Sequence, residues 1–266
     1  MAKLSCVFII TTLAQLFPIS LFAVTDGEID GDAHPAVVLV LMEIDGLPAL
    51  RCSGVLIAPS FVLTAGHCAQ SDRFSGIRIF TESDVQNGNN NYPYAGPNAI
   101  EAIRWEAHPD ISTEPVRYND VGMIELATPI QLPLEQYATL PVVNILDSLT
   151  NQRGLQDTSF TAVGYGYQYI NPVFIERKLI RMFANPKLVA INAPGITEDS
   201  TILLSNNHST GGVCFGDSGG PNFIGDSLVV AGVTSFVRNG NCAGTGGVFR
   251  IDRQNVLDFI NNFIQK

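Results

Sequence analysis

Short runs of hydrophobic and β-branched residues recur along the whole chain, with turn residues between them. The runs include residues 36–42, 55–64, 77–81, 122–127, 160–163, 228–233 and 248–251. Polar or glycine-rich segments, such as Asp45–Gly46, residues 86–91 and residues 237–247, separate them and are expected to form turns. Many short strands joined by turns are typical of antiparallel sandwiches and barrels, so the pattern predicts an all-β protein.

The clearest helical pattern lies at the C-terminal end of the chain. Apolar residues follow the i, i+3, i+4, i+7, i+8 spacing of one helix face at Val256, Phe259, Ile260, Phe263 and Ile264. Asp252 precedes them and is a candidate N-cap. We therefore expect a helix over about residues 252–265 that packs on the outside of the molecule.

The N-terminal segment has the features of a leader for export. Lys3 is followed by a largely apolar run that ends at Ala23 and is interrupted by Gln15 and Pro18. This composition predicts a signal peptide over residues 1–23 and a secreted protein, whether extracellular or periplasmic. A membrane anchor is the alternative, but the interruptions break a run that is already at the short end of spanning length. After cleavage we expect no association with a membrane.

Composition and charge exclude two classes of protein. Of the 266 residues, 46% are hydrophobic and 15% are charged, so the chain is not disordered and must bury a core. The net charge of −10 has the wrong sign for a protein that binds phosphates by releasing counterions, and nucleic acid is not an expected partner. Nothing in the sequence indicates an oligomer, so a monomer is the default expectation.

Cysteine usage agrees with export. Removal of the leader also removes Cys6 and leaves four cysteines: Cys52, Cys68, Cys214 and Cys242. An even number in an exported chain suggests two disulfide bonds. Four cysteines allow three pairings, of which pairing between sequence neighbours is the simplest.

Hydrolysis of an acyl bond near neutral pH needs a nucleophile, a base, a group that orients the base, and donors for the developing oxyanion. The segment Gly216–Gly220 places Ser218 among glycines, where bare N–H groups can approach a substrate oxygen. Ser218 is therefore the candidate nucleophile. Taken alone, a serine among glycines is more often a turn residue, so this interpretation needs partners elsewhere in the chain.

One of the four histidines stands out as a candidate base. His34 and His108 each precede a proline and are expected in extended surface turns, and His208 lies in a polar loop. His67 instead ends an apolar run and is followed by Cys68. A structural role or metal ligation is the alternative for such a histidine, but the short Cys and His spacings of zinc sites do not occur in the sequence.

The third partner must be a buried acid that orients the base. Asp120 precedes the apolar segment 121–124 and is the candidate. An aspartate at the start of a strand is usually a solvated cap or turn residue. The presence of Ser218 and His67 favours the catalytic interpretation of Asp120.

These motifs occur together in one known family. The blocks are CSGVLI at 52–57, LTAGHC at 63–68, NDVGMIEL at 119–126, GYG at 164–166, CFGDSGGP at 214–221, VTSF at 233–236 and GGVF at 246–249. They resemble, in the same order, the blocks of chymotrypsin-like serine proteases and span nearly the whole mature chain. The resemblance implies a protease domain over residues 24–266, all-β, with two packed six-stranded antiparallel β-barrels and a C-terminal helix. The barrels would cover about residues 24–138 and 139–250.

The resemblance also implies a role for each candidate residue. His67 and Asp120 from the first barrel and Ser218 from the second would form a catalytic triad. The N–H groups of Gly216 and Ser218 would form the oxyanion hole. Ser235 would bond near Asp120, and the backbone of Ser235, Phe236 and Val237 would pair with the substrate. The expected partner is a protein or peptide substrate, and no metal or organic cofactor is expected.

The same resemblance implies the disulfide pairing and the specificity pocket. The bridges would be Cys52–Cys68 and Cys214–Cys242. The base of the pocket would be Gly212, with Val213 beside it, Gly247 on the opposite wall and Val237 at the rim. None of these residues is charged and Val237 narrows the entrance, so cleavage after small or medium apolar residues is expected rather than after Lys or Arg.

Activation is expected to differ from that of digestive relatives, which are cut after a basic residue. Between Lys3 and Arg51 the chain has no Lys or Arg, so a tryptic activation cut is unavailable there. Signal cleavage after Ala23 would instead expose Val24, whose amine could pair with Asp217, the acid before the nucleophile. The competing interpretation is that another group holds Asp217.

Residue order tests two rival hydrolase folds. Segment 216–220 also fits the G-x-S-x-G elbow of α/β-hydrolases, but those enzymes place their histidine after the serine and none follows Ser218. The subtilisin order of acid, histidine and serine could be met by Asp32, His67 and Ser218. That fold would require a helix after Ser218, where the sequence is strand-like.

A non-enzymatic alternative is a protease-fold binding protein that has lost catalysis. Such proteins usually lack a triad residue, whereas all three are present here. An endopeptidase is therefore the favoured prediction.

Overall fold

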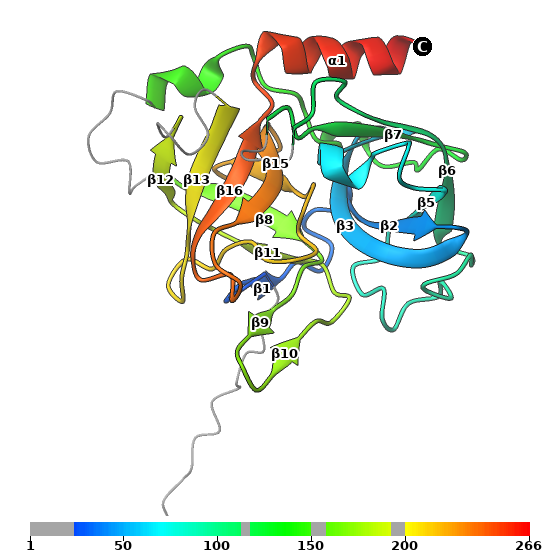
Figure 1. Cartoon of the computed structure of the whole chain (residues 1–266), viewed down its shortest axis with the longest axis horizontal. Helices are drawn as coiled ribbons and strands as arrows, with labels where there is room; N and C mark the ends of the chain where they lie inside the picture. The colour runs from blue at the N-terminus through cyan, green and yellow to red at the C-terminus, as the bar shows by residue number, and fades with distance from the viewer. Residues whose placement is uncertain (1–23, 113–117, 150–157, 193–199) are drawn as a thin grey trace, which may run out of the picture.

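The computed structural model describes residues 24–112, 118–149, 158–192 and 200–266 (Figure 1). The predicted signal peptide lies outside these residues. The predicted all-β class is confirmed, because the described chain contains sixteen strands and one α-helix, α1 (Gln254–Gln265). Among the described residues, no helix combines the length and the hydrophobicity that a membrane crossing requires.

The first half of the chain forms a closed antiparallel barrel. Around the barrel the strands are β2 (Val37–Ile44), β3 (Leu47–Ala58), β4 (Phe61–Thr64), β7 (Gly122–Leu126), β6 (Ala99–Ala107) and β5 (Gly76–Phe80). Residues 37–42 of β2 are all buried, because one face of this strand lines the barrel interior and the other packs toward the second half. This explains why β2 is a continuous apolar run rather than an alternating one.

The second half is a curled antiparallel sheet. Its strand order is β1 (Glu28–Ile29), β11 (Met182–Ala184), β8 (Phe160–Gly164), β14 (Pro221–Ile224), β15 (Val230–Val237), β16 (Gly244–Arg250), β13 (Thr201–Asn206) and β12 (Leu188–Ile191). Its first strand, β1, lies in the range expected for the first barrel but pairs with β11. The sheet is not a fully hydrogen-bonded barrel. Six of its strands nearly close a circle, because the isolated bridge Ser159–Lys187 joins the start of β8 to the start of β12.

The largest hydrophobic core runs through both halves, and a smaller one around Phe160 and Ile202 lies within the second half. The largest core includes residues of β2 to β7, together with Val163, Phe223 and Val233 of the second sheet. Arg181, which is 1% exposed, also connects the halves. Its guanidinium donates to Asp30 Oδ2 at 2.8 Å and to the carbonyl of Val37 at 3.0 Å. These contacts hold the N-terminal segment and β2 against β11, and so they hold the two halves in one arrangement.

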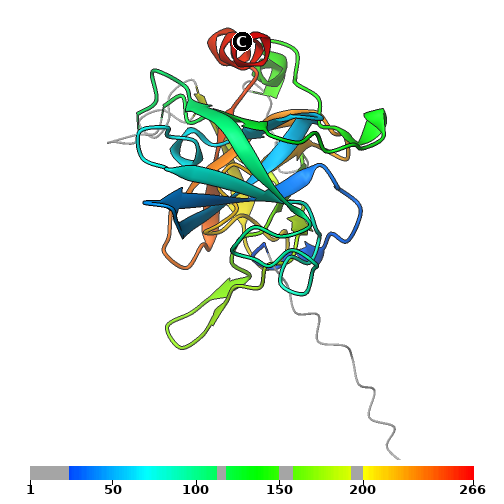
Figure 2. The same cartoon turned by 90° about the vertical axis from the view of Figure 1, so that its right-hand side faces the viewer.

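Three short 3₁₀ helices and one small hairpin complete the described structure. The 3₁₀ helices are η1 (Gly66–Cys68), η2 (Leu134–Gln136) and η3 (Ile145–Leu149). The hairpin pairs β9 (Tyr169–Ile170) with β10 (Ile175–Glu176). It projects away from the body of the molecule in both views (Figures 1 and 2).

The helix α1 lies outside the strands in both views, as predicted (Figures 1 and 2). Its buried residues Val256, Ile260 and Phe263 join the core. The predicted cap was wrong. The helix begins at Gln254 without a side-chain cap, and Asp252 is bound instead by Arg250, at 2.8 Å between Nη2 and Oδ2. A fully buried arginine competes more strongly for that carboxylate than the exposed N–H groups of a helix end.

Two of the histidines do not lie in the extended surface turns that were predicted. His108 is 5% exposed and packs on Phe259, with ring centroids 5.1 Å apart. His34 stacks on Phe223 at 5.6 Å. In both cases an aromatic partner from a distant segment covers the ring, which the local sequence could not reveal.

Candidate active site

Antiparallel pairing of β4 with β7 brings the first two candidates together. The register places Thr64, at the end of β4, opposite Gly122, at the start of β7. His67 follows that end by three residues and Asp120 precedes that start by two. His67 Nδ1 lies 2.9 Å from Asp120 Oδ2 and 3.0 Å from Oδ1, and the backbone N–H of His67 donates to Oδ1 at 2.9 Å. The carboxylate therefore orients both the ring and the backbone of the histidine.

Asp120 is completely buried, and its charge is compensated by its neighbours. The Ser235 hydroxyl, which comes from β15 of the second sheet, donates to Oδ2 at 2.5 Å. Burial by itself would raise the pKa of Asp120, but interaction with His67 and the hydrogen bonds from His67 and Ser235 outweigh it and lower the pKa to about 2. Asp120 is therefore ionised at neutral pH and holds the Nδ1 side of the imidazole as the proton-bearing side.

Ser218 lies in the loop before β14, and contacts with both halves hold this loop. Its carbonyl accepts from the N–H of Ser53 in β3 at 2.8 Å. The N–H of Gly219 donates to the carbonyl of Thr234 in β15, also at 2.8 Å. Gly219 has φ +80°, and a Cβ here would collide with Thr64 Oγ1 and the carbonyl of Ser53. Glycine is required at this position for both reasons.

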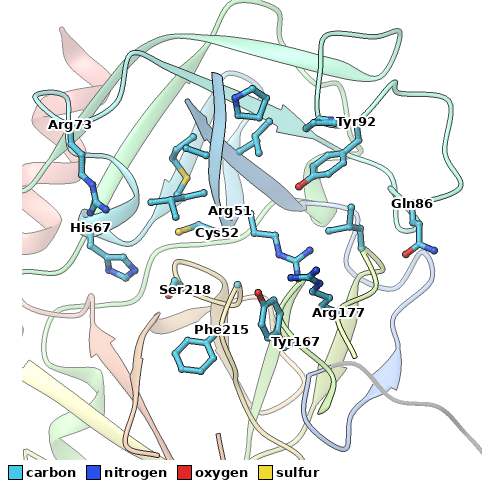
Figure 3. Close-up of a pocket in the computed structure, with 18 residues that line it drawn as sticks. Arg51, Cys52, His67, Arg73, Gln86, Tyr92, Tyr167, Arg177, Phe215 and Ser218 are labelled. Carbon is cyan, nitrogen blue, oxygen red and sulfur yellow. The ribbon is translucent and has the colours of Figure 1, made fainter. Parts of the chain in front are cut away.

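The nucleophile and base candidates line the same cleft. A cleft of about 770 Å³ is bordered by His67, Gly216 and Ser218 among other residues. Figure 3 shows the imidazole and the serine at the same end of this cleft. Within the described ranges, the N–H groups of Gly216 and Ser218 donate to no protein acceptor and remain available to a ligand. Gly216 adopts φ +98°, a conformation that favours glycine.

Two disulfide bonds support this region. Cys52 is bonded to Cys68 and Cys214 to Cys242, which are the pairs that the resemblance implies. The first joins β3 to η1 beside His67, and the second lies next to the Ser218 loop. The two sulfur atoms near His67 are thus bonded to each other, so this cluster offers no pair of thiolates to a metal ion.

Asp217 is fully buried behind the nucleophile loop. It accepts the N–H of Gly166 at 2.7 Å and that of Cys214 at 2.8 Å. Burial raises its pKa to about 7, and the two N–H donors and the charge of Arg51 offset this effect only in part. The charge of Arg51 therefore compensates this carboxylate only in part.

The predicted activation segment lies beside the loop that carries Asp217. Val24 is buried against Met182 and Ala184. The next residue, Thr25, forms an isolated β-bridge with Gly212, two residues before Cys214. Val24 is thus held on the second half of the molecule, near the segment that carries Asp217.

The predicted pocket residues lie on neighbouring segments. Register pairs Phe236 with Gly247 and Val237 with Gly246. A Cβ on Gly246 would approach Val213 Cγ2 to 2.5 Å, whereas a Cβ on Gly247 would collide with the Phe236 ring. The residue that faces Val213 is therefore Gly246, whereas the predicted wall residue Gly247 lies against Phe236.

Comparison with known proteins decides the family. The trypsin family model matches residues 28–260. The chain belongs to the trypsin family. It is thus a homologue of serine proteases.

The proteins similar to this trypsin-family chain include some named as proteases and one named as an inactivated protease paralogue. It is 26% identical to a collagenase from Hypoderma lineatum, over 87% of this chain and 85% of the relative. It is 31% identical to chymotrypsin-like elastase family member 3B from Macaca mulatta, over 72% of this chain and 73% of the relative. Its fold matches the crystal structure of scabies mite inactivated protease paralogue S-D1 with a TM-score of 0.68 and 21% identity, covering 91% and 98% of the two chains. Because both proteases and an inactivated paralogue are similar to this chain, only the geometry of its own site can support catalytic activity.

Sequence reasoning missed two polar features of this trypsin-family site. Asn206 is fully buried against Gly212, and its Nδ2 donates to the carbonyl of Val213 at 2.6 Å. Arg51 borders the cleft and lies over the Tyr167 ring, with Cζ 5.1 Å from its centroid. No local motif marks either residue: Asn206 contacts the turn that follows its own strand, and Arg51 contacts Tyr167, which is distant in sequence.

Proposed function

We propose that this trypsin-family protein is a serine endopeptidase that acts through His67, Asp120 and Ser218. The observation that carries the proposal is the His67–Asp120 pair, whose imidazole borders the same cleft as Ser218. A carboxylate that is buried, ionised and bonded to Nδ1 leaves Nε2 as the basic nitrogen. A histidine with only a structural role would not need that arrangement at the edge of an open cleft.

The mechanism follows from these groups. His67 Nε2 accepts the proton of the Ser218 hydroxyl as Oγ attacks the scissile carbonyl, and a tetrahedral intermediate forms. The imidazolium is stabilised by Asp120 and gives its proton to the leaving amine, which leaves an acyl-enzyme on Ser218. Water then repeats the two proton transfers and releases the acid. The chemistry uses no metal or organic cofactor.

The oxyanion would be stabilised by the N–H groups of Gly216 and Ser218. Both lack a protein acceptor in the part of the chain that the structure describes. Removal of one such donor typically costs about 10²- to 10³-fold in turnover. The backbone of Ser235, Phe236 and Val237 would bind the acyl side of the substrate as an added strand.

The side chain before the cut would enter between Gly212, Val213, Val237 and the glycines at 246 and 247. No carboxylate occurs among these residues to select Lys or Arg. We therefore propose cleavage after small or medium apolar residues, and the similarity to elastase family members agrees with this proposal. Cleavage of a peptide library mainly after Lys or Arg would contradict it.

Secretion and activation belong to the same proposal. Disulfide-bonded members of this family are typically secreted, and signal cleavage would release residues 24–266. The new Val24 amine would then add a positive charge to that of Arg51 beside Asp217. N-terminal sequencing of secreted protein tests this directly, because any start other than Val24 contradicts it.

One alternative has a specific observation in its favour. The similarity in fold to an inactivated protease paralogue supports a catalytically silent binding protein. A serine-directed fluorophosphonate separates the two functions. We expect the secreted protein to be labelled at Ser218, and Ser218→Ala not to be labelled. If the folded protein with its mature N-terminus is not labelled, the proposed endopeptidase function is wrong.

A further inference from the structure

The cleft beside Ser218 extends away from the residues that would bind the acyl side of a substrate. Its lining includes Leu50, Arg51 and Phe215, but none of the pocket residues Gly212, Val213 or 235–237. If the acyl part of a substrate lies along 235–237, this part of the cleft receives the segment that leaves as the new amine. The inference therefore rests on the proposed function.

Three arginines from separate segments line the cleft, two of them side by side and the third, Arg73, near His67 (Figure 3). Arg51 belongs to β3, Arg73 follows η1, and Arg177 follows β10. Figure 3 shows the guanidinium groups of Arg51 and Arg177 next to each other, with Tyr167 beside them. No aspartate or glutamate occurs among the residues that line the cleft. The three positive charges therefore lie where no acid of the cleft wall neutralises them.

This concentration of unpaired positive charge is unusual for the molecule. The chain has 25 acidic residues and 15 basic ones, so acidic partners are in excess. Ion pairs to carboxylates hold most of the described cations: Arg78, Arg104, Lys178, Arg181, Arg250, Arg253 and Lys266. The described cations without such a pair are Lys187 and Arg238, together with the three that line the cleft. Three of these five described cations thus line the same cleft.

The hydrogen bonding of Arg51 gives separate support for a carboxylate site in this cleft. Its Nη2 is buried and has no hydrogen-bond partner among the described residues. Burial lowers the pKa of Arg51, and the like charge of Arg177 acts in the same direction, against attraction by Tyr92, Tyr167 and Asp217. Nη2 has almost no solvent-accessible surface, so a carboxylate would bind the part of the guanidinium that borders the cleft and compensate the buried charge there. The flat guanidinium matches the geometry of a carboxylate.

The position of Arg51 relates this site to the bond that is cut. Arg51 Nε lies 3.3 Å from the place that a Cβ on Gly216 would occupy, and Gly216 is a proposed oxyanion donor. An extended chain advances about 3.3–3.6 Å per residue. Arg51 is thus within reach of the first few residues after the cut, and Arg177 lies next to it (Figure 3).

We propose that this arginine-lined part of the cleft binds a carboxylate on the leaving side of the substrate. The enzyme then prefers peptides that carry Asp or Glu among the first three residues after the cut. The same chemistry would also accept the terminal carboxylate of a short leaving segment. Arg51 and Arg177 are in this view residues that determine specificity.

The test compares matched peptides that share one acyl segment. The residues at the first, second and third positions after the cut are changed one at a time between Asp, Asn and Lys, with an amidated C-terminus. For at least one position we expect kcat/KM to be about 3- to 10-fold higher with Asp than with Asn, and lowest with Lys. The preference should decrease when NaCl is raised from about 0.05 M to 0.5 M, because salt screens partly exposed charges.

Variants then assign the preference to the cleft. Arg177→Gln should bring the Asp/Asn ratio toward one. Lys187→Gln is the matched control, because it removes the same charge from an exposed, unpaired cation that does not line the cleft. It should leave the ratio unchanged. An equal change in both variants would indicate a general effect of net charge and would overturn the proposal.

A further arm separates the two sources of the carboxylate. Peptides that end two or three residues after the cut are compared with a free and an amidated C-terminus. A higher rate only for the free acid assigns the site to a terminal carboxylate, and a higher rate for internal Asp assigns it to a side chain. If peptides are cleaved but neither carboxylate matters, the inference is wrong while the proposed function stands. If Ser218 fails to label, the proposed function is wrong, and affinities of the Asp and Asn peptides for Ser218→Ala still test the carboxylate site.

Discussion

Asp120→Asn isolates the orienting and electrostatic role of the buried acid. The substitution keeps the size of the side chain but replaces a carboxylate oxygen by an NH₂ group, which must face one of the donors from His67 or Ser235. The imidazole then loses the partner that keeps the proton on Nδ1. We expect kcat/KM to fall by on the order of 10⁴, while fluorophosphonate labelling of Ser218 slows in parallel.

The stability effect can be worked from the pKa. The pKa of Asp120 is lowered from 3.8 to about 2, and this difference corresponds to about 2 kcal/mol of folding free energy. Because the folded-state pKa is depressed, this stability is present above pH 4 and is lost as the pH falls toward 2. The variant should therefore be about 2 kcal/mol less stable than the parent at pH 7, and the difference should shrink below pH 4.

Urea unfolding measures this difference in a Ser218→Ala background, which prevents self-digestion. The fluorescence of Trp105, the one tryptophan of the chain, reports the transition. Asp110→Asn is the matched control, because the same chemical change there affects an exposed acid. The reasoning is refuted if Asp120→Asn retains more than about a tenth of the activity, or if its stability deficit is the same at pH 7 and pH 3.

Two further changes test the surroundings of this pair. Ser235→Ala removes a charge-assisted hydrogen bond of 2.5 Å to Asp120, so we expect the free energy of unfolding in urea at pH 7 to fall by about 1.5–3 kcal/mol. The pKa of Asp120 should rise, and acid unfolding should therefore begin at a higher pH. Ser235→Thr, which keeps the hydroxyl, should retain more of the stability. Replacing Cys52 and Cys68 together by alanine opens a loop with a sequence separation of 16, which should cost about 3 kcal/mol. Thermal unfolding with and without reductant checks the second prediction, and an unchanged midpoint in the alanine variant would contradict it.

Local sequence predicted the strands well where a run of apolar residues had a simple boundary. Residues 122–127 correspond closely to β7, and residues 77–81 to β5. The run 55–64 is instead divided between β3 and β4, because the chain turns at Pro59 and Ser60 inside it. Strand β6 was not predicted, since its residues are only partly buried and its apolar pattern is weak.

Some parts of the candidate site could be predicted from local sequence, and others depend on contacts between distant segments. His67, Asp120 and Ser218 could be selected as candidates from local motifs, because the proposed chemistry restricts the residue types next to each group. The identity of Gly246 as the residue facing Val213 depends on the register between β15 and β16. Register is a property of two strands together, so a count along one segment could not decide between Gly246 and Gly247.

The amino-acid sequence by itself determined the fold class, the terminal helix and the family, because the hydrophobic pattern and the short motifs are each contained in a few neighbouring residues. Only the tertiary structure decided which charges remain without partners. Asp252 is bound by Arg250 rather than capping the helix, and the cations at 51, 73 and 177 converge from three segments on one cleft. The energy of a charge depends on which distant groups come within a few ångströms of it and on how much water they displace, and those distances exist only after the chain has folded.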